Sequence, residues 1–319
     1  MSQHLQDPSE LCLDKGRWPG RAFLPNMSRG HVPLGPQHGG LTAAVTALWA
    51  QQLGVPAEDL VLCATATEAW HLGLGALLQP EDVCLVAEPA PIGALAAVLR
   101  SGSKYVDVGR LFDGRIDQGT LSLAQTLHPL AWLVACAPSL TGAMDTDNLI
   151  VSQLDRAIID ASFQPFWQPA AGPAPLLTLL ALRDPDDPVF PLIYAWVARL
   201  GHGAMLRMLQ GPVLLPPPLA DRAWAVLTVI ERDRDCATRV HDKLAKRYEK
   251  FAAILRPMTN VVLLPQAGWM ASAYAIDGQA LTVATRIEPQ LAPVAAYGAQ
   301  PLQHLVVVDL GACRERPAT

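Results

Sequence analysis

The sequence predicts an α/β protein whose main domain is a mostly parallel sheet covered by helices on both faces. Short apolar runs alternate with segments of helical spacing between residues 60 and 160. Strands that alternate with helices form parallel sheets, because each crossover helix returns the chain to the same edge. A chain of 319 residues, 51% apolar and 17% charged, is also long enough to bury the cores of two lobes. We therefore expect a three-layer αβα large domain followed by a smaller α/β domain.

The elements of the large domain follow from apolar spacing and from the residues that stop helices. Residues 1–40 are rich in Pro, Gly and His without periodicity, which indicates an irregular arm. Apolar residues at helical spacing predict a helix over 40–54, with Gly54 as its stop. The expected strands are 60–63, 83–87, 105–108, 131–135, 157–159 and 176–182, and the expected helices are 67–78 and 92–101.

A proline-rich segment at 211–218 marks the expected end of the large domain, because its Gly-Pro and Pro-Pro-Pro strings interrupt regular structure. Beyond it, the charged helical stretch 219–255 indicates one long solvated connecting helix. Strands of the smaller lobe are expected at 261–264, 271–275 and 305–310. The sequence thus predicts an arm over 1–40, a large αβα domain over 41–215 and a small C-terminal α/β domain over 216–319.

Charge and cysteine pattern narrow the class of function. The net charge of −5, without a basic run, argues against a nucleic-acid partner. No apolar stretch of 18 residues occurs, and the first 20 residues contain no apolar core segment, so we expect a cytoplasmic protein with no membrane partner. The six cysteines form no CxxC pair, which favours reduced core residues over a metal site. A small-molecule ligand or a protein partner remains.

Four strings carry a resemblance to a known family. They are Leu-Cys-Ala-Thr-Ala-Thr-Glu-Ala-Trp at 62–70, Ile-Ile-Asp-Ala-Ser-Phe at 158–163, Ala-Arg-Leu-Gly-His-Gly-Ala at 198–204 and Val-Val-Leu-Leu-Pro-Gln-Ala-Gly-Trp at 261–269. In this order they resemble motifs of the class I/II aminotransferases, the fold-type-I group that depends on pyridoxal phosphate (PLP). The likeness runs from about residue 40 to residue 311, and it implies the aspartate-aminotransferase-like, or PLP-transferase, fold, usually a homodimer.

The resemblance also implies a cofactor site. The matching residues are Thr65, Ala66, Thr67, Asp160, Phe163 and Arg199. In the family, the amides of the first string hold the cofactor phosphate at a helix N-terminus. The aspartate pairs with the pyridine nitrogen, and the arginine clamps the phosphate with its planar fork. The alternative is that Asp160 and Arg199 are structural residues of an inherited scaffold.

The family's Schiff-base lysine has no counterpart in this chain. It normally lies eight residues before the phosphate-binding arginine, and counting back from Arg199 reaches Pro191. Alignment by the strand 176–182 reaches Arg183 or Asp184 instead. Since an imine to the cofactor aldehyde needs a primary amine, this departure implies no covalent cofactor. Non-covalent binding of PLP or pyridoxamine phosphate stays open.

Three further positions depart from the family. Pro91 stands where an aromatic ring stacks on the pyridine, so that contact with the ring face is lost. The loop 137–142 lacks the asparagine that bonds the cofactor hydroxyl. The strand 304–309 lacks the arginine that grips the substrate carboxylate. Four losses together indicate that selection for the cofactor chemistry has relaxed or changed direction.

Three residues near these motifs each have two interpretations. His202 is a weak candidate for a general base, or a histidine in the place of the family's tyrosine. Trp70 and Trp269 lie beside motifs that face the family's cleft. They are candidates for a ligand pocket lined by indole rings, or else core residues.

The leading hypothesis is a degenerate aminotransferase-like protein, repurposed as an enzyme that acts on an amino-acid-derived small molecule in biosynthesis. A second is a non-catalytic subunit or binding partner of an active aminotransferase. A third is a PLP-dependent aminotransferase whose lysine lies elsewhere. A colourless homodimer with turnover would favour the first, and co-purification with a lysine-bearing relative the second. A yellow protein that reacts with borohydride would favour the third.

Overall fold

The part of the chain that the computed structural model describes belongs to one compact unit, residues 36–319. It comprises residues 39–88, 90–111, 115–139, 156–166, 175–186, 188, 190–199, 201, 203, 206, 215–264, 266, 268–275, 292–293, 296–297 and 305–311. The predicted arm over 1–40 lies almost entirely outside this part.

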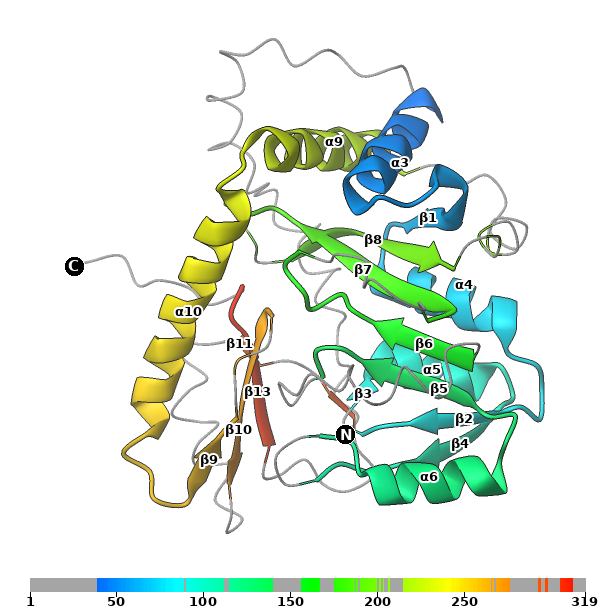
Figure 1. Ribbon diagram of the computed structural model, residues 1–319. Helices are drawn as coiled ribbons and strands as arrows, with labels where there is room; N and C mark the ends of the chain where they lie inside the picture. The colour runs from blue at the N-terminus through cyan, green and yellow to red at the C-terminus, as the bar shows by residue number, and fades with distance from the viewer. Residues whose placement is uncertain are drawn as a thin grey trace, which may run out of the picture. The chain divides into compact units, whose positions relative to one another are not determined.

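A seven-stranded sheet forms the centre of the large domain (Figure 1). Its strands are β1 (Leu60–Cys63), β2 (Val83–Val86), β4 (Lys104–Asp107), β5 (Trp132–Cys136), β6 (Ala157–Asp160), β7 (Leu177–Arg183) and β8 (Pro191–Ala198). They lie in the order β1-β8-β7-β6-β5-β2-β4. Only β8 runs antiparallel to its neighbours in this sheet, so the prediction of a mostly parallel sheet is confirmed. The strand at 191–198 was not predicted, because it follows a run of Pro and Asp residues that is typical of a loop.

Helices cover both faces of this sheet. Successive residues of a strand point to opposite faces, and the buried residues of β1 divide accordingly. Val61 and Cys63 pack in the core that includes α4 (Ala66–Leu77) and α5 (Ile92–Arg100). Leu60 and Leu62 pack in the core that includes α3 (Gly39–Leu53) and α9 (Pro217–Arg232). Figure 1 shows α3 and α9 side by side on one face, and the three-layer prediction is confirmed.

The core beneath α4 is organised around two tryptophans. Trp70 and Trp196 are both buried, and their rings meet edge to face with centroids 5.5 Å apart. The indole of Trp196 donates a hydrogen bond of 2.6 Å to the carbonyl of Ala69, so its one polar group is satisfied. Gly73 makes room for this ring, because a Cβ at that position would lie 2.5 Å from Trp196 Cε2.

A four-stranded antiparallel sheet forms the smaller C-terminal part, in the order β11-β13-β10-β9. Its strands are β9 (Val261–Leu263), β10 (Met270–Ala275), β11 (Ala292–Pro293) and β13 (Leu305–Asp309). The helix α10 (Cys236–Leu255) buries Val240, Leu244 and Phe251 in a core shared with Trp269 and Val308. The remaining elements are a helix α6 (Gln118–Leu127), a 3-10 turn η2 (Ala57–Asp59), and a two-residue ladder of β3 (Ala90–Pro91) with β12 (Ala296–Tyr297).

The prediction of one continuous helix over 219–255 is wrong. The chain breaks between α9 and α10 at Asp233, whose backbone is extended at φ −102° and ψ 93°. Its carboxylate accepts a hydrogen bond from the Asp235 amide at 3.1 Å and one from Arg239 Nη1 at 2.9 Å. A short acidic side chain that accepts hydrogen bonds from nearby backbone amides stabilises a non-helical backbone. The chain therefore turns at Asp233. The domain boundary at 215/216 stays a prediction, and α9 beyond it shares its core with α3.

Candidate functional site

The carboxyl ends of the parallel strands bring several predicted residues to one edge of the large sheet. Thr65 follows β1, Asp160 ends β6 and Arg183 ends β7. In open α/β sheets, ligands bind at this edge, outside the carboxyl ends of the strands. We call it the carboxyl edge and describe its residues in turn.

Thr65 and Glu68 cap the N-terminus of α4. The Thr65 hydroxyl accepts a hydrogen bond of 3.1 Å from the Glu68 amide, and the Glu68 carboxylate accepts one of 2.8 Å from the Ala64 amide. The two side chains satisfy amides that the first helical turn leaves without partners. Ala66 and Thr67 begin the helix, where backbone amides favour an anion. The Glu68 carboxylate already supplies one negative charge there.

Asp160 is a buried carboxylate at the end of β6. It is 1% exposed, and its Oδ1 accepts a hydrogen bond of 2.9 Å from the Ser162 amide. Burial raises the pKa of this carboxyl group to about 6, although hydrogen bonds from Ser162 oppose the shift. Within the described residues, no cation pairs with it. A desolvated carboxylate in this condition favours either a proton or a cationic ligand.

The segment after Asp160 is joined to the smaller sheet. The Phe163 carbonyl accepts a hydrogen bond of 2.8 Å from the Trp269 amide. The backbone approaches closely here because Gly268 has a φ of +57° and no side chain. A Cβ on Gly268 would lie 2.1 Å from the Phe163 oxygen. The predicted site residue Phe163 is therefore a point of attachment between the two sheets through its backbone.

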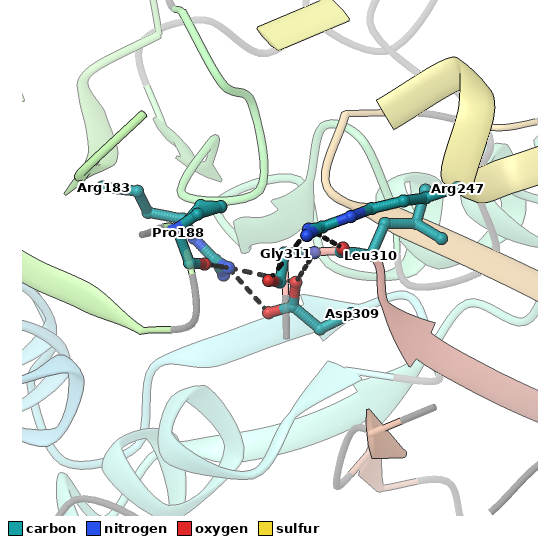
Figure 2. Close-up of polar contacts among 6 residues, drawn as sticks. All are labelled: Arg183, Pro188, Arg247, Asp309, Leu310 and Gly311. Atoms are coloured by element: carbon teal, nitrogen blue, oxygen red, sulfur yellow. Dashed lines mark hydrogen bonds and ion pairs between the residues drawn. The ribbon is translucent and has the colours of Figure 1, made fainter. Parts of the chain in front are cut away.

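Arg183 makes a dense set of contacts at the end of β7. Its side chain is 4% exposed, and its Nη1 lies 2.8 Å from a carboxylate oxygen of Asp309 on β13. The same Nη1 donates to the Pro188 carbonyl at 3.1 Å, and the guanidinium lies over the Trp269 ring, 5.0 Å from its centroid. Asp309 also accepts a hydrogen bond of 2.8 Å from the Gly311 amide. Figure 2 shows the two charged side chains directed toward each other.

Arg247 of α10 completes this cluster from the other side. It donates hydrogen bonds to the carbonyls of Leu310 at 2.6 Å and of Gly311 at 3.1 Å (Figure 2). The end of β7 and the end of β13 are thus held together by a partly buried ion pair, and its carboxylate also accepts a hydrogen bond from the Gly311 amide. Sequence analysis missed this contact. Its signal was a charged residue at the end of each of two apolar runs, Leu-Leu-Ala-Leu-Arg and Leu-Val-Val-Val-Asp.

Both sequence registers for the family's lysine converge on the turn between β7 and β8. Arg183 pairs with Pro191 across this hairpin, so the two alignments point to one place. Asp184 is buried beside them and pairs with Arg222 at 3.3 Å. Residues 183–191 contain no lysine. Lys104 lies elsewhere, at the start of β4, where it pairs with Glu81 at 2.8 Å.

Arg199 lies at the opposite edge of the sheet. Because β8 runs antiparallel to β7, its last residue, Ala198, pairs with Leu177, the first residue of β7. The Arg199 amide accordingly donates to the Leu176 carbonyl at 2.9 Å. Strands of four residues, such as β1, separate the edges by about 13 Å. The structure therefore does not bring Arg199 to Thr65–Thr67 and Asp160, because the sequence alignment took no account of the direction of β8.

The turn after Arg199 is hydrogen-bonded to η2. The amides of Gly201 and Gly203 each donate a hydrogen bond of 3.2 Å to the buried Asp59 carboxylate. Gly203 packs so closely that a Cβ there would lie 2.1 Å from the Glu58 carbonyl oxygen. His202, the weak candidate base, lies outside the described residues.

Both candidate pocket tryptophans are buried. Trp70 is 2% exposed and packs on Trp196, and Trp269 is 3% exposed beneath the Arg183 guanidinium. Pro91 takes part in the short ladder with β12, where it pairs with Ala296. Residues 140–142 of the loop that replaces the family's asparagine loop lie outside the described residues.

The described residues were also searched for reactive cysteines, clusters of metal ligands and membrane-spanning helices. Cys63, Cys84, Cys136 and Cys236 are free thiols and buried, and burial raises the pKa of Cys84 to about 12. Such a thiol is a core residue and not a nucleophile at neutral pH. In the described ranges, no three His, Cys, Asp or Glu side chains gather as metal ligands. None of the helices in those ranges has the length and apolar character needed to cross a membrane.

No protein-family model and no curated protein sequence matches this chain, whereas solved structures do. Histidinol-phosphate aminotransferase from Sinorhizobium meliloti, in complex with pyridoxal-5'-phosphate, superimposes with a TM-score of 0.67 at 12% identity. That match covers 92% of this chain and 85% of the other. The chain has the PLP-transferase fold.

Two further structures with the PLP-transferase fold differ in the reaction that their names describe. N-succinyldiaminopimelate aminotransferase from Mycobacterium tuberculosis matches with a TM-score of 0.62 at 18% identity, over 91% of this chain and 84% of the other. L-threonine-O-3-phosphate decarboxylase from Porphyromonas gingivalis matches with a TM-score of 0.64 at 12% identity, over 91% and 93%. At these identities the likeness establishes the fold predicted from the sequence, and activity has to be argued from the site.

Proposed function

We propose that this chain is a degenerate, aminotransferase-like protein that works without a Schiff base to PLP. Instead of a covalently held cofactor, the protein binds a small, amine-bearing molecule derived from an amino acid, at the carboxyl edge of the large sheet. The observation that carries the proposal is the distribution of charge at that edge. Asp160 is buried and has no cation paired with it among the described residues, while Arg183 at the end of β7 pairs with Asp309.

The residues at the carboxyl edge do not fit a covalently held PLP. Arg183 occupies the end of β7, where the family's lysine is expected, and its guanidinium cannot form an imine. Arg199, the predicted phosphate clamp, lies at the other edge. Two features still suit a phosphorylated pyridine bound non-covalently, namely the α4 N-terminus and the Asp160 carboxylate.

Asp160 supplies the chemistry of the proposed site. A protonated amine placed against it would donate a charge-assisted hydrogen bond to the carboxylate in a dry environment, where this contact is stronger than in water. A carboxyl group with a pKa of about 6 also exchanges its proton readily near neutral pH. We therefore propose that the protein is a repurposed enzyme in biosynthesis whose reaction moves a proton at the bound amine, with Asp160 as the group that holds it.

We further propose that the protein acts as a cytoplasmic homodimer without nucleic-acid or membrane partners. The family's usual dimeric state and the acidic net charge of −5 support this. Gel filtration with light scattering measures the mass of the assembly directly, and a monomer or a complex with another chain would contradict the homodimer.

Calorimetry with purified protein tests the binding proposal. We expect a panel of amino acids and their decarboxylated amines to contain a ligand whose affinity falls about tenfold or more in Asp160→Asn, because a hydrogen bond to a charged group is lost. PLP and pyridoxamine phosphate belong to the same panel as phosphorylated pyridines. The matched control is Asp59→Asn, which alters another buried carboxylate at the opposite edge.

Two outcomes would contradict the proposal. One is a pyridoxyl adduct on a lysine after borohydride reduction and peptide mapping, which would mean that a Schiff base forms. The other is the absence of any amine ligand combined with stoichiometric co-purification of a lysine-bearing relative. That result would favour a non-catalytic subunit.

A further inference from the structure

The outer side of α6, the helix at the bottom of Figure 1, carries exposed leucines. Leu123 and Leu127 lie about one helical turn apart, and Leu130 follows the end of the helix. These three leucines are 61%, 66% and 69% exposed. Leu121 and Ala124 of the same helix are buried in the core beneath it, so the leucines lie on the face that does not pack on the sheet. We call Leu123, Leu127 and Leu130 the α6 stripe.

The surroundings of the α6 stripe carry no charge. Residues 118–130 contain no Asp, Glu, Lys or Arg. The helix α10, in contrast, exposes charged residues, among them Asp242, Lys246 and Glu249. The solvated face of a helix is normally charged or polar, and exposed apolar groups that gather on one face mark a contact with another molecule. The α6 stripe therefore has the composition of a surface that another molecule covers.

The α6 stripe leads away from the carboxyl edge. α6 connects β4 with β5, and both strands run parallel to β2. A helix between two parallel strands returns the chain from the carboxyl edge to the opposite edge. Leu130 stands two residues before β5 begins, so it lies at that opposite edge. A molecule that contacts the stripe is therefore not a ligand of the Asp160 site.

Charges of opposite sign lie at the two ends of α6. Asp117 caps the N-terminus, where its carboxylate accepts hydrogen bonds from backbone amides of the first turn. Near the other end, Arg156 Nη1 donates a hydrogen bond of 2.7 Å to the Leu130 carbonyl. An acid, an uncharged apolar stripe and a base in this order complement a second copy of themselves when the two helices run antiparallel. Antiparallel packing also brings opposite ends of the two helix dipoles together.

We propose that the α6 stripe is a contact between two copies of this chain, related by a twofold axis and with their α6 helices antiparallel. The stripe has no charge to repel its copy, although the whole chain carries a net charge of −5. Stable interfaces bury about 800 Å² from each partner, which takes about 20 to 30 residues a side. Three leucines supply only the centre of such an area, so the association is weak and depends on concentration. This contact does not rest on the amine site or on the homodimer proposed above.

Sedimentation velocity from micromolar to near-millimolar protein tests the contact. We expect the parent protein to associate reversibly in this range. Leu127→Glu should weaken that association about tenfold or more, because the twofold axis places two carboxylates in the apolar contact. Leu123→Glu, as a second variant, should act in the same direction. The matched control is Leu99→Glu, at a leucine 59% exposed on α5, which packs on the opposite face of the sheet and should leave the association unaltered.

Leu127→Cys locates the contact on the chain. A twofold axis through the α6 stripe brings the two copies of position 127 near each other, so mild oxidation should link two copies of this variant through the new thiol. Peptide mapping identifies the linked positions. Leu99→Cys should not form such a link, and the parent protein accounts for cross-links through its own cysteines, of which the described ones are buried.

Circular dichroism confirms that each variant is folded before it is compared with the parent protein. A parent protein without concentration-dependent association would overturn the proposal and leave the α6 stripe to a different partner. An association that Leu127→Glu leaves unchanged would also overturn it, and would assign the contact between copies to another face. Leu127→Glu should behave as the parent does in the calorimetric panel of amines, so failure of the amine site and failure of this contact are separate results.

Discussion

Replacing Asp160 by Asn should make the unliganded protein more stable at neutral pH. The carboxyl group has a pKa of about 6 in the folded chain, against an ordinary value of 3.8, because it is buried. Each unit of difference corresponds to about 1.4 kcal/mol, so ionised Asp160 costs the fold about 3 kcal/mol at pH 7. Asparagine has nearly the same size and carries no charge, so it should avoid most of that cost.

The effect has a defined dependence on pH. Since the folded pKa lies above the unfolded value, the unfolded chain releases the proton first as the pH rises. The free energy of unfolding of the parent protein should therefore fall between about pH 4 and about pH 6 from this group, and its contribution should be constant above that. Asp160→Asn should match the parent near the lower limit and exceed it above the upper one.

Urea unfolding followed by far-UV circular dichroism, at about pH 4, 6 and 7.5, measures this difference. Asp59→Asn is the matched control, since Asp59 is also buried but accepts hydrogen bonds from the Gly201 and Gly203 amides. That variant should lose about 1 to 3 kcal/mol, because a charge-assisted acceptor is replaced. If the free energy of unfolding rises in Asp160→Asn and falls in Asp59→Asn, the two buried carboxylates differ as expected. The burial of Asp160 is poorly compensated, whereas Asp59 is stabilised by two backbone amides.

The reasoning would be refuted if Asp160→Asn were equal to or less stable than the parent at pH 7.5. It would also be refuted if the variant kept the same fall in stability between about pH 4 and 6. A more stable variant that no longer binds the amine ligand would link the free-energy cost of burying the Asp160 carboxylate to the proposed function.

Three further predictions concern the lysine and the helix α4. Borohydride reduction of the purified protein followed by peptide mapping should find no pyridoxyl lysine, and such an adduct would contradict us. Arg183→Lys should not restore amino transfer to 2-oxoglutarate, because the new ammonium would pair with Asp309; steady turnover in a coupled assay would count against this. Gly73→Ala should destabilise the protein by about 2 kcal/mol or more, because the new methyl group would overlap the Trp196 ring. Gly75→Ala lies in open space on the same helix and should stabilise the protein by about 0.5 to 1 kcal/mol. Thermal unfolding of both variants measures the two changes in stability.

Much of the fold followed from local pattern. The alternation of apolar runs and helical segments placed β1, β2, β4, β5, β6 and β7 within about two residues of their observed bounds. Gly54 was expected to end the first helix, and its φ of +67° is the conformation that glycine adopts most easily. Asp160 at the end of β6 was also expected, because the string at 158–163 resembles the family's strand that ends in an aspartate. The identity of residues 183–191, which include no lysine, is likewise a property of the sequence alone.

The tertiary structure decided which of these residues meet. The direction of β8 sends Arg199 to the edge opposite Asp160, and this depends on a pairing with β7 that local spacing does not reveal. The contact of Arg183 with Asp309 joins positions 126 residues apart, so the sequence around either residue does not identify the other as its partner. Trp70 was placed beside a cleft by its motif, but packing against Trp196 buries it. Periodicity reports which face of an element is apolar, whereas the contacts between elements depend on strand order and direction, which arise only when distant segments pair.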